Sequence, residues 1–324
     1  MLSEYLTHVG RINVYLDPNT TPHPKQVGDI PYSLPLVLDK NDPIVAVQRD
    51  DTLQVVIRCP PRIQNFDIKV PWKGLDFDSN LEQVVQCRYC SGKLASFFSC
   101  RDLPSANWQE LMDCWACHVD FPAALAKNGG MPSFAPTKDM SYSGISFLLL
   151  HPNSLENSQS YEKDSSMYHC PSCQEQLGIQ DKQDVPESVR LDKSCIMING
   201  NRVHPSYVVT SELLTLRELN AVHKFCLTDQ CNTLYIWCFT PYLPVTFFNS
   251  PNITASFPQS PVATIKTLYC YDPPDNLQGD DWQDITLTPS VFLEIKHLLE
   301  LTTQSFPSSA QKFQHWYVGL LPRL

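Results

Sequence analysis

Apolar residues fall in short runs along most of the chain, and clusters of proline, aspartate and asparagine separate the runs. Runs of this kind, rich in β-branched and aromatic residues, are typical of β-strands. The clearest are Thr52–Arg58 and residues 67–70, 233–239 and 263–270, and residues 315–320 are expected to pair as a closing strand. The pattern therefore predicts a strand-rich protein.

Two stretches have a helical period instead. Residues 103–118 carry apolar side chains at intervals of three and four, which places them on one face of a helix. A second helix is expected to open at Thr288-Pro289, because proline is preorganised for the first helical position. The two apolar stripes are Trp108, Leu111, Met112 and Trp115 in the first helix and Phe292, Ile295, Leu298 and Leu299 in the second.

Composition supports an α+β fold with few helices. Hydrophobic residues make up 43% of the 324 positions and aromatic residues 10%, which favours a globular chain over a disordered one. Prolines number 27 against 11 glycines, which favours many short elements with stiff connections. The polar stretch 151–169 is nearly devoid of aliphatic residues and is expected to be a loop or linker between residues 1–150 and 170–324.

Charge and hydropathy narrow the class of protein. The formal net charge is −10, from 34 acidic and 24 basic residues, so direct binding of nucleic acid is not expected. No run approaches the roughly 18 apolar residues that a membrane span requires, and the first residues lack the pattern of a secretory signal. We expect a protein of the cytoplasm and nucleus that does not contact a membrane.

Thirteen cysteines in a reducing compartment indicate metal binding or catalysis before disulfides. Six of them form Cys-x-x-Cys pairs, a spacing that presents two thiolates to one tetrahedral ion. One pair cannot complete the coordination shell, so a structural Zn²⁺ needs two pairs. The pairs are Cys87/Cys90, Cys114/Cys117 and Cys170/Cys173.

Spacing leaves two ways to build one zinc site. The local choice joins the first pair to the second, and the distal choice joins the first to the third, which requires the fold to bring two distant loops together. Cys114 and Cys117 can share one helix face, where both can also be ordinary buried residues. The remaining thiols are expected to be core residues, because free cysteine is often buried: Cys59, Cys100, Cys195, Cys226, Cys231, Cys238 and Cys270.

Cys117 runs directly into His118 at the end of the first predicted helix. Adjacent side chains diverge, so the two are poorly placed to serve one ion together. Three roles stay open for His118: a metal ligand, a general base that activates the Cys117 thiol, or a cation at the helix C-terminus.

Four motifs in order resemble the HECT-like ubiquitin ligase family, whose members bind ubiquitin-conjugating enzymes. The resemblance spans most of the chain and is strongest to fungal members linked to polyadenylation. The motifs are Cys87-Arg-Tyr-Cys90, then Leu103-Pro-Ser-Ala-Asn-Trp108 leading to Trp115-Ala-Cys117-His118, then Cys170-Pro-Ser-Cys173 with Leu177-Gly178, and Leu287-Thr-Pro-Ser-Val-Phe-Leu-Glu294 with Phe306-Pro-Ser-Ser309.

The resemblance implies ubiquitin transfer or a supporting role around it, with a ubiquitin-conjugating enzyme as partner. It also implies a link to the endonuclease subunit of the pre-mRNA cleavage and polyadenylation machinery. Cys114 lies outside the family pattern, which favours the distal zinc site with Cys87, Cys90, Cys170 and Cys173 as ligands, joining the two halves of the chain.

Two functional hypotheses follow. In the first, the protein is a ubiquitin ligase or E2-binding protein in which Cys117 accepts ubiquitin and His118 activates it. In the second, it is a non-enzymatic assembly factor or chaperone for the processing endonuclease, and every motif cysteine is structural. The last cysteine is Cys270, with no Thr-Cys-Phe context after it, so the thioester mechanism of true HECT ligases is not supported.

Overall fold

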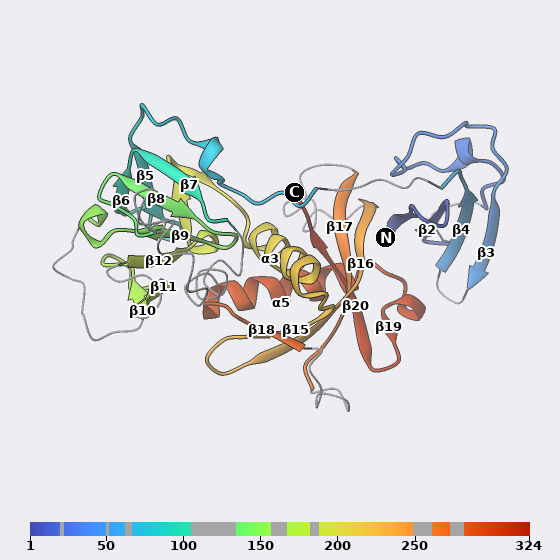
Figure 1. The fold of residues 1–324 in the computed structure, drawn as a ribbon. Helices are drawn as coiled ribbons and strands as arrows, with labels where there is room; N and C mark the ends of the chain where they lie inside the picture. Colours follow the sequence, from blue (N-terminus) through green and yellow to red (C-terminus); the bar gives the residue numbers. More distant parts are fainter. Residues whose placement is uncertain are drawn as a thin grey trace, which may run out of the picture. The chain divides into compact units, whose positions relative to one another are not determined.

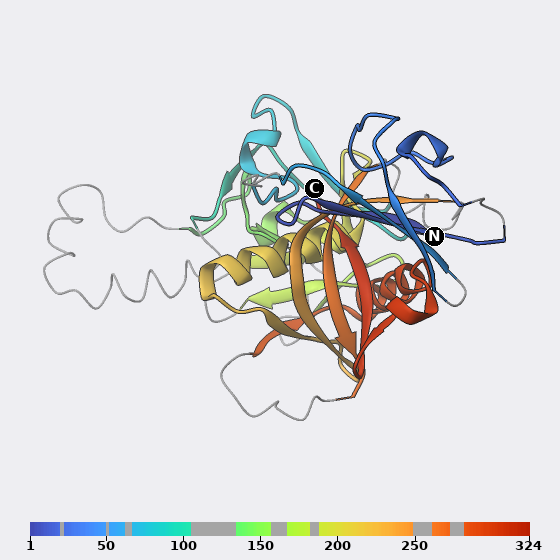
Figure 2. The ribbon, with the colours of Figure 1, turned by 90° about the vertical axis from the view of Figure 1, so that its right-hand side faces the viewer.

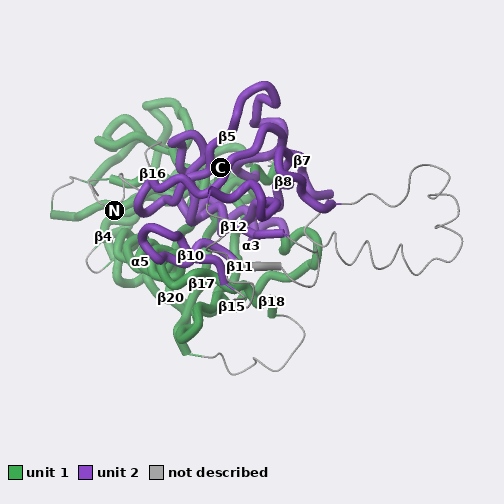
Figure 3. Tube along the Cα trace, turned by 90° about the vertical axis from the view of Figure 1, so that its left-hand side faces the viewer, with its two compact units in different colours: residues 1–69, 216–324 green, residues 70–215 purple. Residues whose placement is uncertain are grey.

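The computed structural model describes residues 1–19, 23–49, 52–61, 67–104, 134–156, 167–181, 188–248, 261–272 and 282–324. The chain forms two compact units, Met1–Lys69 with Leu216–Leu324 (unit 1) and Val70–Thr215 (unit 2), coloured in Figure 3. Unit 1 therefore contains both ends of the chain. The boundaries expected at residues 150 and 170 both fall inside unit 2, because the first strands pair with strands far along the sequence.

Unit 1 is built on one ten-stranded sheet in which the N-terminal strands continue the C-terminal ones (Figure 1). The main path runs β19 (Lys312–Phe313), β20 (Trp316–Pro322), β17 (Val262–Cys270), β16 (Thr233–Phe247), β1 (Leu2–Leu6), β2 (Arg11–Leu16), β4 (Thr52–Arg58) and β3 (Val45–Arg49), and β15 (Lys224–Thr228) joins β16 to β18 (Trp282–Thr286).

The predicted strands of unit 1 form, with one exception. Thr52–Arg58 is β4 with the expected bounds, and the other predicted runs lie in β16, β17 and β20, which lie side by side in Figure 2. Residues 67–70 are not a strand. This segment is followed by Pro71 and carries the chain from unit 1 into unit 2, so the prediction from its apolar alternation is wrong.

Helix α5 (Pro289–Thr303) begins at the predicted position, with Thr288 as its N-cap residue. It packs directly on β20, where a methyl group added to Gly319 would lie 2.7 Å from Leu299 Cδ2. The Thr303 hydroxyl also lies 2.8 Å from the carbonyl oxygen of Val318, to which it donates. The close approach explains why glycine stands at this position of the strand.

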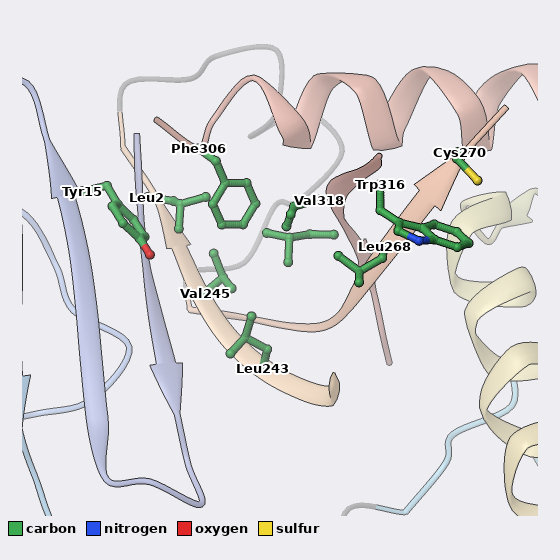
Figure 4. Packing of buried hydrophobic residues seen from close by; sticks show 10 residues of the cluster. Leu2, Tyr15, Leu243, Val245, Leu268, Cys270, Phe306, Trp316 and Val318 are labelled. Atoms are coloured by element: carbon green, nitrogen blue, oxygen red, sulfur yellow. The ribbon is translucent and has the colours of Figure 1, made fainter. Parts of the chain in front are cut away.

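The core of unit 1 contains residues from both ends of the chain, shown as sticks in Figure 4. A buried carboxylate adds a polar link between them: Glu4 on β1 accepts hydrogen bonds from Lys266 Nζ on β17 (2.8 Å), Asn13 Nδ2 (3.0 Å) and Tyr15 Oη (3.1 Å). A buried charge is tolerated when it is paired and hydrogen-bonded in this way. The core residues include Leu2, Tyr15, Leu243, Val245, Leu268, Phe306, Trp316, Val318 and Leu320.

Unit 2 holds two further sheets. The six-stranded sheet runs β10 (Met167–His169), β11 (Gln176–Asp181), β12 (Ser188–Asp192), β9 (Phe147–Leu150), β8 (Met140–Ser143) and β7 (Ser99–Asp102), and the four-stranded sheet runs β14 (Asn201–Arg202), β13 (Ile196–Ile198), β5 (Gln83–Cys87) and β6 (Lys93–Phe97).

One helix of the structure was not expected, and one expected helix lies mostly outside the described residues. Helix α3 (Pro205–Asn220) was not predicted, and its weakly amphipathic sequence explains why. The helix predicted over 103–118 falls mostly within residues 105–133, outside the described residues.

The polar stretch 151–169 is not wholly a loop, because Pro152–Ser154 forms a 3₁₀ turn and Met167–His169 is β10. None of the described helices is long and apolar enough to cross a membrane.

Lys193 is a fully buried lysine that holds the start of unit 2 in place. Its ammonium donates to the carbonyl oxygens of Pro71 (2.7 Å) and Gly144 (2.7 Å) and to Ser143 Oγ (2.8 Å), with the carbonyl oxygen of Trp72 at 3.3 Å. Trp72 has a positive φ of 53°, an uncommon backbone state for a tryptophan. The lysine therefore joins the entering segment to the loop between β8 and β9.

Candidate metal centre

The first cysteine loop lies between β5 and β6. The backbone N–H of Cys87 donates to the Gly92 carbonyl oxygen (2.8 Å), and the N–H of Ser91 donates to the Cys87 carbonyl oxygen (2.9 Å). Ser91 has a φ of 61°, in the left-handed region, which turns the chain back into β6. This tight turn directs the side chains of Cys87 and Cys90 toward a common point.

The second cysteine loop, between β10 and β11, repeats the same hydrogen bonds at the same offsets. The N–H of Cys170 donates to the Glu175 carbonyl oxygen (2.8 Å), and the N–H of Gln174 donates to the Cys170 carbonyl oxygen (2.9 Å). Gln174 has a φ of 63°. Two loops that share only the Cys-x-x-Cys spacing thus adopt one backbone form, which indicates a shared role.

The four sulfur atoms of these loops lie within 4.8 Å of one another. The Cys87 and Cys173 sulfurs are 3.7 Å apart, and those of Cys90 and Cys170 are 3.6 Å apart. A tetrahedral zinc ion with Zn–S bonds of ~2.3 Å has sulfur–sulfur edges of about 3.8 Å. Both the spacing and the soft, all-sulfur donor set therefore fit zinc.

Burial of the thiols explains why a cation suits the site. Cys87 and Cys170 are buried, whereas Cys90 and Cys173 are exposed. Burial raises the pKa of the Cys87 thiol to about 12, although backbone N–H groups of Cys90 and Tyr89 donate to its sulfur and act in the opposite direction. Four thiolates so close together repel one another, and a divalent cation that replaces their protons removes that repulsion.

The cluster joins the two sheets of unit 2. Cys87 ends a strand of the four-stranded sheet, and Cys170 follows a strand of the six-stranded sheet. The loops touch closely: a methyl group on Gly92 would lie 3.2 Å from Ser172 Oγ and 3.3 Å from Cys90 Sγ. Four protein ligands leave no open position for water or substrate, so the geometry is that of a structural site.

The cluster brings together segments that are distant in sequence. One cysteine pair comes from residues 1–150 and the other from residues 170–324, and all four cysteines lie in unit 2, so a metal here would join two sheets of one compact unit. The other candidate residues, Cys114, Cys117 and His118, lie outside the described residues.

Sequence reasoning missed the residues that shape the loops. Ser91 and Gln174 adopt the left-handed conformation, and Gly92 allows the loops to approach. The sequence position could have indicated these residues, because each stands at a fixed offset after the first cysteine of its Cys-x-x-Cys pair. Gly178, noted only as part of a motif, has a definite role: a methyl group there would lie 2.0 Å from the Arg190 carbonyl oxygen on β12.

Most of the other described thiols are poor nucleophiles. Burial raises the pKa of Cys100, Cys226 and Cys270 to about 11 and that of Cys238 to about 12. Cys195, Cys226, Cys238 and Cys270 are buried as expected, whereas Cys59 and Cys100 are half-buried. The prediction is wrong for Cys231, which is exposed in the turn between β15 and β16.

Fold and site together define a strand-rich α+β protein with a closed four-cysteine centre. A family model described as "HECT-like ubiquitin-conjugating enzyme (E2)-binding" matches residues 8–318. The chain therefore belongs to the HECT-like E2-binding family, which places it among proteins with a ubiquitin-related function.

Two curated fungal relatives extend this assignment. An uncharacterized protein of Schizosaccharomyces pombe is 46% identical over 327 residues, covering 100% of this chain and 98% of the relative. An uncharacterized protein of Saccharomyces cerevisiae is 21% identical over 257 residues, covering 76% of this chain and 71% of the relative. No solved structure matches the chain.

Proposed function

We propose that this protein binds a ubiquitin-conjugating enzyme and takes part in ubiquitin transfer, as a HECT-like ubiquitin ligase stabilised by one structural zinc ion. The observation that carries the proposal is the family match over nearly the whole chain. The cluster of Cys87, Cys90, Cys170 and Cys173 supports the zinc, because its sulfur spacing fits tetrahedral coordination. The zinc is proposed to stabilise unit 2 and not to take part in transfer.

The acceptor that we propose is Cys117, activated by His118. Support comes from elimination among the described thiols: the cluster cysteines are committed to metal, and those of the core are buried with raised pKa values. Cys231 is exposed, in a turn where the Asp229 carboxylate accepts its backbone N–H (2.8 Å), and it serves as the comparison in the loading test below. A histidine beside a thiol raises its thiolate character.

Loading with activated ubiquitin tests the acceptor. A conjugating enzyme charged with ubiquitin is mixed with the wild-type protein, and a thioester adduct is detected by its loss on reduction. We expect Cys117→Ser to abolish the adduct and the matched Cys231→Ser variant to retain it. An adduct that survives Cys117→Ser, or a wild-type protein that never forms one, contradicts the proposed acceptor role.

We also propose a second function for this family member, without ubiquitin transfer. In this proposal the protein is an assembly factor or chaperone for the endonuclease of pre-mRNA 3′-end processing, in the nucleus and cytoplasm. One observation favours it, namely that the last cysteine of the chain, Cys270, is buried and has a raised pKa. In cells that lack the protein, Cys117→Ser restores the level of the endonuclease if this second proposal holds. The same variant fails to restore it if ubiquitin transfer is required.

A further inference from the structure

The strands β2, β4 and β3 form the N-terminal end of the unit 1 sheet, and one face of this end carries an unusual combination of side chains. The register places Arg11 directly opposite Arg58, and Arg49 lies on the same face at the other end of the three strands. These strands contain three arginines and no acidic residue, in a chain whose formal net charge is −10. We call this surface the arginine face.

The arginines of this face lack acidic partners. No carboxylate of the described residues lies within ion-pair distance of Arg11, Arg49 or Arg58. Like charges directly opposite each other on neighbouring strands destabilise a sheet. The Arg11–Arg58 pair therefore costs stability in the free protein, and an anionic group bound between the two guanidinium groups would remove that cost.

Among the residues that the structure describes, no strand pairs with the outer edge of β3. β3 is the last strand on its side of the sheet, and its neighbour on the other side is β4 (Figure 1). Val45 is 62% exposed and Val47 is 45% exposed, on the same face as Arg49. The strand has no proline, bulge or inward-pointing charge, which are the devices that normally prevent an edge strand from pairing with another chain.

We propose that the arginine face and the β3 edge bind an acidic, extended segment of a partner protein, which adds one strand to the sheet. Backbone hydrogen bonds along β3 provide affinity, and alternate side chains of the added strand provide specificity. Apolar side chains of the segment cover Val45 and Val47. Its carboxylates pair with Arg49 on β3 and, across β3, with the exposed Arg58 on β4.

Chemistry favours a protein segment over nucleic acid. Single-stranded nucleic acid is bound through exposed aromatic platforms, and the aromatic residue of this face, Tyr15, is buried against the core. Between the arginines, Val45 and Val47 are exposed, whereas Gln54 and Val56 are half-buried; the two exposed valines suit an apolar peptide side chain. The surface also differs from the metal centre, which lies in unit 2.

The test uses a synthetic, fluorescently labelled peptide of alternating glutamate and valine residues and the full-length protein. We expect saturable binding that weakens as salt rises, and slower amide hydrogen exchange in β3 when the peptide is present. The double variant Arg49→Gln/Arg58→Gln should weaken binding about tenfold or more. Arg202→Gln, at an exposed arginine on β14 in unit 2, is the matched control and should bind like the wild type.

Four outcomes would overturn the proposal. The first three are equal binding of a lysine–valine peptide, unchanged peptide affinity in the double variant, and unchanged amide hydrogen exchange in β3 when the peptide is present. The fourth is competition by poly-uridine at the same concentration as the acidic peptide, which would assign the face to nucleic acid. Sedimentation without peptide tests the remaining occupant: a wild-type dimer lost in the double variant would mean that the face binds a second copy. Because both substituted arginines are exposed strand residues, the variants should fold, and Arg58→Gln should unfold no earlier than the wild type because it removes the Arg11–Arg58 pair.

Discussion

The buried ammonium of Lys193 offers the sharpest test of how unit 2 is held together. Replacing it with methionine keeps an unbranched side chain that is one atom shorter and removes the donor. The carbonyl oxygens of Pro71 and Gly144, each 2.7 Å from the ammonium, then lose that partner. The Ser143 hydroxyl oxygen, which also accepts from the ammonium, is less affected by the substitution, because this hydroxyl still donates to the Trp72 carbonyl oxygen at 2.6 Å.

The magnitude follows from the loss at these two acceptors, of which the Gly144 carbonyl oxygen keeps only a long contact with the Ser143 hydroxyl at 3.3 Å. A buried acceptor without a partner costs about 1–3 kcal/mol, and removal of the buried charge recovers part of that loss. We therefore expect Lys193→Met to lower the free energy of unfolding by about 2–4 kcal/mol. Lys193→Ala should lose about 2 kcal/mol more, because it also leaves a cavity.

Urea unfolding followed by tryptophan fluorescence measures the difference. Lys138→Met, which changes an exposed lysine of the same unit, is the control and should stay within about 0.5 kcal/mol of the wild type. If Lys193→Met unfolds at the wild-type urea concentration, the ammonium makes no net contribution, and the assigned role of this residue is wrong.

Three further predictions concern pH, the metal and one glycine. Burial lowers the pKa of Lys193 to about 7 in the folded protein. The unfolded chain therefore binds more protons between about pH 7 and 10, and the contribution of this lysine to stability rises with pH. Plots of unfolding free energy against pH for the wild type and Lys193→Met should diverge in that window, and parallel plots would contradict the lowered pKa. Native mass spectrometry should find one zinc ion in the wild type and in Cys231→Ser but none in Cys173→Ser, and retention of zinc by Cys173→Ser would rule out the four-cysteine site. Gly178→Ala should destabilise unit 2 by about 3 kcal/mol in thermal unfolding, because its methyl group would lie 2.0 Å from the Arg190 carbonyl oxygen, and an unchanged melting temperature would show that β11 and β12 can separate at little cost.

The direction of the pH effect depends on what surrounds Lys193. Desolvation is the largest cause of its lowered pKa, and Lys73 acts in the same direction. Cys100, Asp102 and Asp76 act in the opposite direction and limit the shift. Lys193 is therefore expected to couple pH to the stability of unit 2 between about pH 7 and 10.

Local patterns determined much of the secondary structure. Thr52–Arg58 forms β4 and Thr288-Pro289 starts α5, because alternation of apolar residues and a proline at the first helical position act through neighbours in sequence. Residues 67–70 carry the same alternation without forming a strand. A strand also needs a neighbour, and this segment connects the two units instead.

The sequence by itself also determined that cysteine pairs were available for a metal, since two thiols three residues apart can face one ion. It left open which pairs meet, because that depends on contacts between distant segments. Tertiary structure decided this by bringing Cys87 and Cys90 to Cys170 and Cys173. It also decided that both ends of the chain share one sheet and that Lys193 is buried, because strand pairing and desolvation are set by residues far away in sequence.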